Sequence, residues 1–310
     1  MKKKTSSRRL PLLLLGIAVI TATLALTLVQ ARRQSRESPF QAARAFQDAR
    51  AVIDKGPRPA GSRAIEETRQ YIVAELKKVN LEPVLDEFES DTPRGKTKMV
   101  NIRAIRKGKR PDTIAVTGHY DTKVFENARF LGANDGGSST AVVLELARVT
   151  GNMNLEHTLE FIFFDGEEAV IEWTAEDSVY GSRHDVSRRY RDGTLRLLKA
   201  LVLVDMIGDR NLDIRRESGS TGWLTDIVWA TARSLGHDRH FLNQEQAIED
   251  DHVPYLRAGI PAVDLIDFNY PAWHTPADTL DKISADSLKI VGDVVYFSLS
   301  EIDKKLLAPQ

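Results

Sequence analysis

The sequence predicts an α/β fold in which a mixed, largely parallel sheet lies between two layers of helices. Apolar strand-like runs alternate with segments of helical periodicity along the chain. Residues 159–164 form an almost unbroken apolar run, which is typical of a central strand covered by helices on both faces. About 270 residues remain after the N-terminal forty, which is within the range of one large α/β domain.

Residues 1–31 are predicted to be a membrane anchor or signal segment. Basic residues precede residues 10–29, an uncharged and mostly apolar stretch long enough to cross a bilayer. The positive-inside rule then leaves the N-terminus in the cytoplasm and the rest of the chain outside it, in the periplasm or extracellular space. Cleavage at residues 29–31 would instead secrete the protein, but the apolar run is long for a cleaved signal. Residues 32–39 are expected to be a linker before a single domain, residues 40–310.

Two helices are expected at the start of this domain. Residues 40–53 show helical spacing of apolar side chains and end before Gly56-Pro57. Ser62 can cap a second helix, whose apolar face is formed by Ile65, Tyr71, Ile72 and Leu76.

The strands and helices then alternate. The expected strands are residues 99–105, 114–117, 159–164, 201–204 and 262–266. The basic residues 107–111 are expected to form an exposed hairpin tip. Helices are expected after residues 132–139, over residues 223–235, and after a capping Ser284 near the C-terminus.

Composition excludes several classes of function. The chain has 43 basic and 44 acidic residues, and this balance argues against a nucleic-acid-binding protein, which would show a basic excess. It has no cysteine, so neither a disulfide nor thiolate chemistry is possible.

Acidic and histidine side chains follow the ends of several expected strands. Asp165, Glu167 and Glu168 follow the apolar run 159–164 directly. The others are His119, Asp121, Asp135, Asp205, Asp250, Asp251, His252 and His274. Strands of one open sheet bring such ends into a single crevice, and carboxylates with imidazoles suit zinc. A divalent ion can take one of two adjacent glutamates as a ligand and leave the other free to carry a proton.

Each of these residues also has a structural explanation. The two glutamates can belong to a solvated turn, and Asp135 can cap the helix that it precedes. His274 can be a core histidine bonded to the backbone. Trp173 and Trp273 can be ordinary core residues.

The motifs together resemble the zinc aminopeptidase superfamily. The resemblance is carried by residues 118–121 (GHYD), 132–135 (GAND), 167–168 (EE), 205–208 (DMIG) and a late histidine. Residues 165–169 (DGEEA), 177–184 (DSVYGSRH), 250–257 (DDHVPYLR) and 273–275 (WHT) are more specifically similar to the glutaminyl-peptide cyclotransferases. The resemblance covers roughly residues 40–305, although Glu249 stands where a glutamine is familiar.

The resemblance implies a three-layer α/β/α sandwich and an enzyme that cyclises N-terminal glutamine of peptides or proteins to pyroglutamate, releasing ammonia. It implies one zinc ion per chain, bound by Asp135, Glu168 and His274. Glu167 would be the general acid/base, with Asp205 and Asp250 in an acidic network beside it. Residues expected to wall the substrate pocket are Trp173, Ile248, Tyr270 and Trp273. His119 and Asp121 are expected to support the site or to bind a second metal ion.

Two alternatives remain open. A two-zinc aminopeptidase would use His119 and Asp205 as further ligands, with Asp135 bridging, and would hydrolyse N-terminal residues. The segment with Trp173 and the doubled acid at Asp250-Asp251 argue against it. A membrane-tethered binding module without activity is disfavoured by the intact set of acids and histidines.

Overall fold

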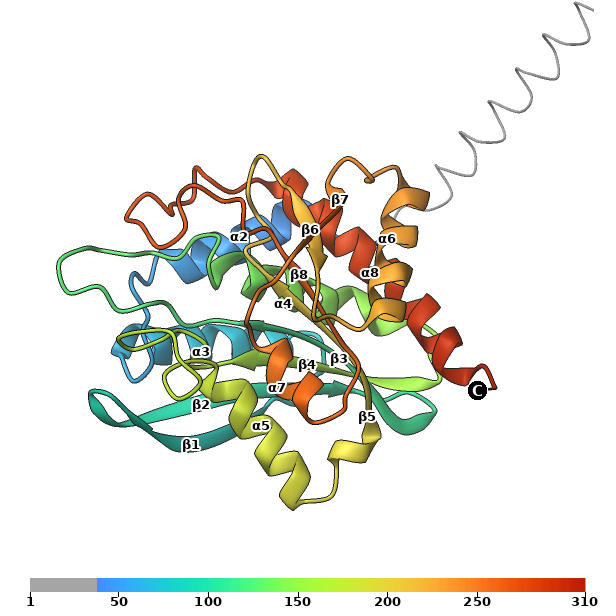
Figure 1. The fold of residues 1–310 in the computed structure, drawn as a ribbon, viewed down its shortest axis with the longest axis horizontal. Coiled ribbons are helices and arrows are strands. Elements are labelled where there is room, and N and C mark those ends of the chain that lie inside the picture. Colours follow the sequence, from blue (N-terminus) through green and yellow to red (C-terminus); the bar gives the residue numbers. More distant parts are fainter. Residues whose placement is uncertain (1–37, 310) are drawn as a thin grey trace, which may run out of the picture. The chain divides into compact units, whose positions relative to one another are not determined.

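The computed structural model describes residues 38–309, and Figure 1 shows their arrangement. The predicted membrane anchor and nearly all of the linker lie outside the described residues. The main sheet has six strands in the order β1-β2-β4-β3-β5-β8. Their bounds are β1 Val84–Thr92, β2 Gly95–Arg106, β3 Arg110–His119, β4 His157–Phe164, β5 Leu198–Asp205 and β8 Ala262–Ile266. Strands β4, β3, β5 and β8 pair in parallel, and β2 and β1 extend one edge in antiparallel pairing. The predicted α/β class is therefore confirmed.

Helices cover both faces of this sheet (Figure 1). One layer contains α2 (Ala42–Ile53), α3 (Arg63–Lys77), α4 (Gly137–Val149), α6 (Gly222–Leu235) and α8 (Ala285–Leu307). Their apolar faces and that face of the sheet form one large core. The opposite layer contains α5 (Tyr180–Arg191) and α7 (His252–Arg257), where Tyr255 packs with Phe164 and Leu203.

Two predicted helix caps are confirmed. The Ser62 hydroxyl accepts a hydrogen bond from the Ile65 backbone N–H at 3.2 Å, and Ser284 does the same for Ser287 at 3.1 Å. These bonds satisfy donors that a helix leaves unpaired in its first turn. The side chains of Ile65, Ile72 and Leu76 then point into the core, as their spacing predicted.

The prediction of a hairpin at residues 107–111 is wrong. Strands β2 and β3 do not pair with each other, because β4 lies between them and bonds to both. All eight residues of β4 are buried, as expected of a central strand that is covered on both faces and paired on both edges. The segment between β2 and β3 therefore crosses over β4 near His157, where β4 begins.

The topology also gathers the polar strand ends at one edge. His119 ends β3, Asp165 follows β4, and Asp205 ends β5. The N-terminus of α4 approaches this edge closely, because a Cβ atom on Gly118 would lie 2.7 Å from the Ser139 Cβ. A smaller sheet, β6 (Ile214–Glu217) with β7 (Phe241–Gln246), lies in the segment between β5 and β8. Among residues 38–309, no helix has the length and apolar character needed to span a bilayer.

Candidate metal and substrate site

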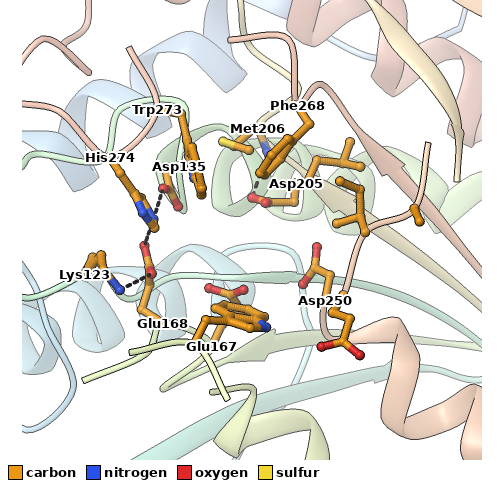
Figure 2. Close-up of a pocket in the computed structure, with 15 residues that line it drawn as sticks. Lys123, Asp135, Glu167, Glu168, Asp205, Met206, Asp250, Phe268, Trp273 and His274 are labelled. Atoms are coloured by element: carbon orange, nitrogen blue, oxygen red, sulfur yellow. Dashed lines mark hydrogen bonds and ion pairs between the residues drawn. The ribbon is translucent and has the colours of Figure 1, made fainter. Parts of the chain in front are cut away.

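A cavity of about 430 Å³ opens at the carboxyl edge of the sheet. Its polar side consists of Asp135, Glu167, Glu168, Asp205 and Asp250, with His274 and Lys123 at one end. Figure 2 shows these side chains pointing into a common space between aromatic walls. The structure thus brings together polar residues that stand up to about 150 positions apart in the sequence.

Asp135, Glu168 and His274 form a cluster whose ligand atoms lie within 4.8 Å of one another. The His274 Nε2 atom is 3.2 Å from Glu168 Oε1 and 3.4 Å from Asp135 Oδ2. Asp135 Oδ2 and Glu168 Oε2 are buried and have no hydrogen-bond partner among residues 38–309. Buried carboxylate oxygens without partners are costly, so the cluster fits a cation. Two oxygens and one imidazole nitrogen are a donor set that suits zinc and leaves a position open.

The charges of the cluster point to the same conclusion. Burial raises the pKa of Glu168 to about 7, and the Asp135 carboxylate adds to this effect. Burial also raises the pKa of Glu167 well above its usual range, and Glu168 and Asp250 raise it further against the effect of His119. Carboxylates crowded in this way need a positive charge to remain ionised at neutral pH. A bound divalent ion would supply that charge.

His119 lies on the far side of Asp135. Its Nε2 atom is 3.0 Å from Asp205 Oδ1 and 3.2 Å from Asp135 Oδ1, so these three residues form a second cluster with the spacing of metal ligands. Asp135 therefore belongs to both clusters. His119 is buried and does not line the cavity, and its ring already shares a hydrogen bond with Asp205.

Asp121 orders the turn that carries the two glutamates. Its carboxylate accepts hydrogen bonds from the Glu167 N–H at 3.1 Å and the Glu168 N–H at 3.2 Å. Gly166 precedes them with φ +70°, a conformation that other residues rarely adopt. The turn directs Glu168 towards His274 and Glu167 towards the middle of the cavity (Figure 2).

A row of buried acids continues behind the cavity. Burial raises the pKa of Asp250 well above its usual range, and the nearby Asp205 and Asp251 carboxylates raise it further. Asp251 accepts a hydrogen bond from Ser182 at 2.5 Å, and Asp264 is completely buried. Such neighbouring carboxylates share protons instead of all being charged. His252 faces away from the cavity and bonds to Glu217 at 3.1 Å.

Aromatic side chains form the cavity walls. Trp273 stacks on His274 at 4.2 Å between ring centroids and lies against Phe268 at 4.5 Å. Trp173 and Ile248 also line the cavity. Tyr270 does not line the cavity: its ring packs with Met206 and Ile266, and its hydroxyl donates to Asp278.

Sequence analysis missed several residues of the site. Lys123 lines the cavity with its Nζ atom 3.9 Å from Glu168 Oε2. Phe268 contributes an exposed ring to the wall. Arg58 and Asp278 are buried beneath the site. Arg58 had one local signal, its position between Gly56-Pro57 and Pro59 in the segment between α2 and α3.

The sequence of this chain matches a known enzyme family. Residues 101–298 match peptidase family M28. The glutaminyl-peptide cyclotransferase of Drosophila melanogaster is 31% identical, over 78% of this chain and 77% of that protein.

Solved structures agree with the sequence comparison. The glutaminyl cyclase of an Acidobacteriales bacterium is 36% identical and superposes with a TM-score of 0.82, covering 87% of this chain and 98% of that chain. The glutaminyl cyclase of Porphyromonas gingivalis is 27% identical with a TM-score of 0.80, covering 86% of this chain and all of that chain. The residues matched to family M28, 101–298, include every residue that lines the cavity.

Proposed function

Because the chain belongs to peptidase family M28 and, within it, to the glutaminyl-peptide cyclotransferases, we propose that it converts N-terminal glutamine of peptides and proteins to pyroglutamate. The observation that carries the proposal is the position of Glu167. This carboxylate lies beside a cluster of metal ligands, inside a cavity walled by tryptophans. Cyclisation requires these same parts: a polarised carbonyl, a proton carrier and a dry pocket.

The zinc ligands would be Asp135, Glu168 and His274. When bound there, zinc would polarise the γ-carbonyl of the substrate and stabilise negative charge on its oxygen. The residues of the chain provide the remaining functions. Trp273 and Phe268 hold the glutamine side chain against the cluster, and Trp173 closes the opposite wall.

Glu167 is the proton carrier. The attacking α-amine must lose a proton and the departing ammonia must gain one, so a single carboxylate between them can serve both steps. Asp250 and Asp205 line the same polar side of the cavity as Glu167. There they accept hydrogen bonds or carry protons beside Glu167. The apolar walls exclude water, which favours attack by the amine over hydrolysis.

We propose that one zinc ion suffices. The first cluster opens to the cavity through His274, whereas His119 in the second cluster is buried and bonded to Asp205. A histidine engaged in this way orients its neighbours, as residues around metal ligands commonly do. Metal analysis of the purified protein should give one zinc per chain. Two zinc ions, both needed for activity, would favour the aminopeptidase alternative.

The proposed reaction is tested with two substrates side by side. A glutaminyl peptide is followed by ammonia release and by the mass of its product, and a leucyl amide is followed by hydrolysis. We expect ammonia and a pyroglutamyl product from the first and no reaction with the second. Rapid leucyl hydrolysis without cyclisation would show that the chain is an aminopeptidase. Zinc binding without either reaction would support the inactive binding module.

We further propose that residues 1–31 anchor the protein in the inner or plasma membrane, with the catalytic domain in the periplasm or outside the cell. The basic head followed by the apolar residues 10–29 supports this orientation. Protease added to intact spheroplasts should then digest the domain. A domain that stays protected until the membrane is lysed would contradict the proposal, and a soluble secreted form would indicate cleavage near residues 29–31.

A further inference from the structure

Asp278 is a buried carboxylate that lies outside both metal clusters. It accepts three hydrogen bonds: from the Asn134 N–H at 2.8 Å, from the Asp135 N–H at 3.1 Å and from the Tyr270 hydroxyl at 2.7 Å. Two of its three donors therefore belong to the loop that carries a proposed metal ligand. The third comes from the segment that leads to another ligand, His274.

Arg58 holds the same loop from the opposite side. Its guanidinium donates to the Gly132 carbonyl at 2.8 Å and to the Asp135 carbonyl at 3.3 Å, and its Nε donates to the Tyr120 carbonyl at 2.8 Å. Arg58 is completely buried, and within residues 38–309 no carboxylate lies within ion-pair distance of it. Its charge instead acts at longer range on Asp135 and Asp278. It is a buried cation beneath a site in which carboxylates predominate.

The Asn134 side chain bonds this loop to the loop that follows β5. Its amide nitrogen donates to the Met206 carbonyl at 3.0 Å, and its oxygen accepts from the Gly208 N–H at 2.6 Å. The backbone of Asp135 is thus bonded at its N–H and its carbonyl, and its neighbour is bonded to the loop after β5. With the backbone fixed, few positions remain for the Asp135 carboxylate.

The segment around His274 is bonded to the same carboxylate, Asp278. Tyr270 and Asp278 stand four residues before and four residues after His274, and they bond to each other. His274 itself has φ +53°, a left-handed conformation that is strained for a residue other than glycine. Such a conformation persists only where the surrounding structure enforces it.

We propose that Asp278 is a positioning residue that fixes Asp135 and His274 relative to each other before metal binds, with Arg58 and Tyr270 as its supports. It does not touch the metal or the substrate. Tyr270 therefore acts through Asp278 and not as a wall of the pocket. The inference rests on the proposed metal site, but it concerns metal affinity and needs no assumption about the substrate.

The test is the variant Asp278→Asn, compared with Asp303→Asn. Asp303 is a matched control because it is a buried carboxylate that accepts two consecutive backbone N–H groups, of Glu156 and His157, and a third bond from the His157 ring. It lies on α8, away from the cavity. Zinc dissociation constants are measured by competition with a chromophoric chelator, and unfolding by urea is measured on the metal-free proteins.

Asp278→Asn should weaken zinc binding by roughly 10- to 100-fold, the usual effect of losing a partner of a metal ligand. The absorption bands of the cobalt-substituted protein should shift as well, because they report ligand geometry. Asp303→Asn should lose stability but keep its zinc affinity within about twofold, because it disturbs no metal ligand. Equal zinc affinity in wild type and Asp278→Asn, with only a loss of stability, would overturn the proposal.

If Asp278→Asn does not fold, Tyr270→Phe is the second test of the proposal. It keeps the ring in its packing and removes only the hydroxyl bond to Asp278. We expect a smaller loss of zinc affinity in the same direction and a shifted cobalt spectrum. An unchanged spectrum and affinity would contradict the coupling through Asp278. Failure of the wild-type protein itself to bind zinc would instead contradict the proposed function, so the two failures are distinguishable.

Discussion

Glu167 and Glu168 are adjacent residues in different surroundings. Glu168 faces His274 and Asp135, and Glu167 faces the middle of the cavity beside Asp250 (Figure 2). The turn after β4 separates them, because Asp121 holds both of their N–H groups. The two side chains can therefore have distinct roles although they share nearly the same position in the chain.

Glu167→Gln should keep zinc bound and lower the turnover of a glutaminyl peptide by roughly 10²- to 10⁴-fold, the usual contribution of general acid–base catalysis. Glutamine keeps the shape of the side chain but cannot carry a proton at neutral pH. Turnover is measured by ammonia release, and zinc is measured on the same sample. Activity within threefold of wild type would assign proton transfer to another group.

Glu168→Gln should instead impair zinc binding. The substitution removes a charged ligand oxygen from the cluster, so zinc affinity should fall by at least about 10-fold. Chelator competition measures this directly, and excess zinc should restore part of the activity. If Glu168→Gln retained zinc as tightly as wild type, the ligand set would need revision.

Most acidic residues of the site could be predicted from sequence because each follows a strand or precedes a helix, whereas His274 stands in an irregular segment and was identified through the resemblance of residues 273–275. The supports beneath them could not. Asp278 stands in an irregular segment after β8, and Arg58 stands in the irregular segment between α2 and α3, so neither has a periodic context. Their roles come from bonds to backbone groups about 75 to 145 positions away, which no local pattern records.

The elements that sequence analysis missed are mostly polar. The helix α5 buries Asp185 and Arg189, which bond to each other at 2.5 Å, and Arg189 also pairs with Glu160 at 2.7 Å. Its inner face is an ion-pair network, so hydrophobic periodicity gives no signal there. The edge strand β1 carries acids, and α7 has only six residues. The long apolar strands and helices were predicted correctly because their hydrophobic periodicity is strong.

In the loop after Glu168, one side chain accepts most of the hydrogen bonds from the backbone around Trp173. The Asp177 carboxylate accepts hydrogen bonds from the N–H groups of Val170, Ile171 and Glu172, at 2.8–3.0 Å, and from the Tyr180 hydroxyl at 2.7 Å. These bonds fix the segment that presents Trp173 to the cavity. Trp173 is therefore a preformed wall whose position depends on Asp177.

Asp177→Asn should release this wall. The amide keeps one acceptor oxygen but puts an NH2 donor where the other stood, so N–H groups that Asp177 bonds lose their acceptor and unfolding stability should fall by about 1–3 kcal/mol. The KM for a glutaminyl peptide should rise, while zinc affinity should stay unchanged because no ligand is disturbed. Steady-state kinetics and chelator competition measure the two effects. A normal KM would show that Trp173 does not depend on this loop geometry.

For the whole domain, zinc binding should stabilise the fold without being required for folding. The two largest cores lie on the two faces of the sheet and contain no residue of the metal clusters. The protein should therefore remain folded when zinc is removed. It should nevertheless be less stable, because zinc binds only the folded arrangement of Asp135, Glu168 and His274.

Chelation should lower the melting temperature by roughly 8–16 °C, if free zinc is about 1,000 times its dissociation constant in the holoprotein. Calorimetry with and without chelator measures the shift, and the unfolding transition should stay cooperative. Glu168→Gln is the control, because a protein that binds zinc weakly should show a smaller shift. A chelated protein without any cooperative transition would show that the domain cannot fold without metal.

The place of β4 between β2 and β3 has a consequence for synthesis of the chain. Strands β2 and β3 leave the ribosome one after the other, joined by a short segment, and nothing yet separates them. The end of β4 follows the end of β3 by roughly 45 residues, or roughly 2–9 s at about 5–20 residues per second. During that interval the two strands can form a hairpin that the finished sheet does not contain. Either this hairpin reopens to admit β4, or the two edges stay apart until β4 arrives, so a pause in translation before β4 should favour misfolded chains.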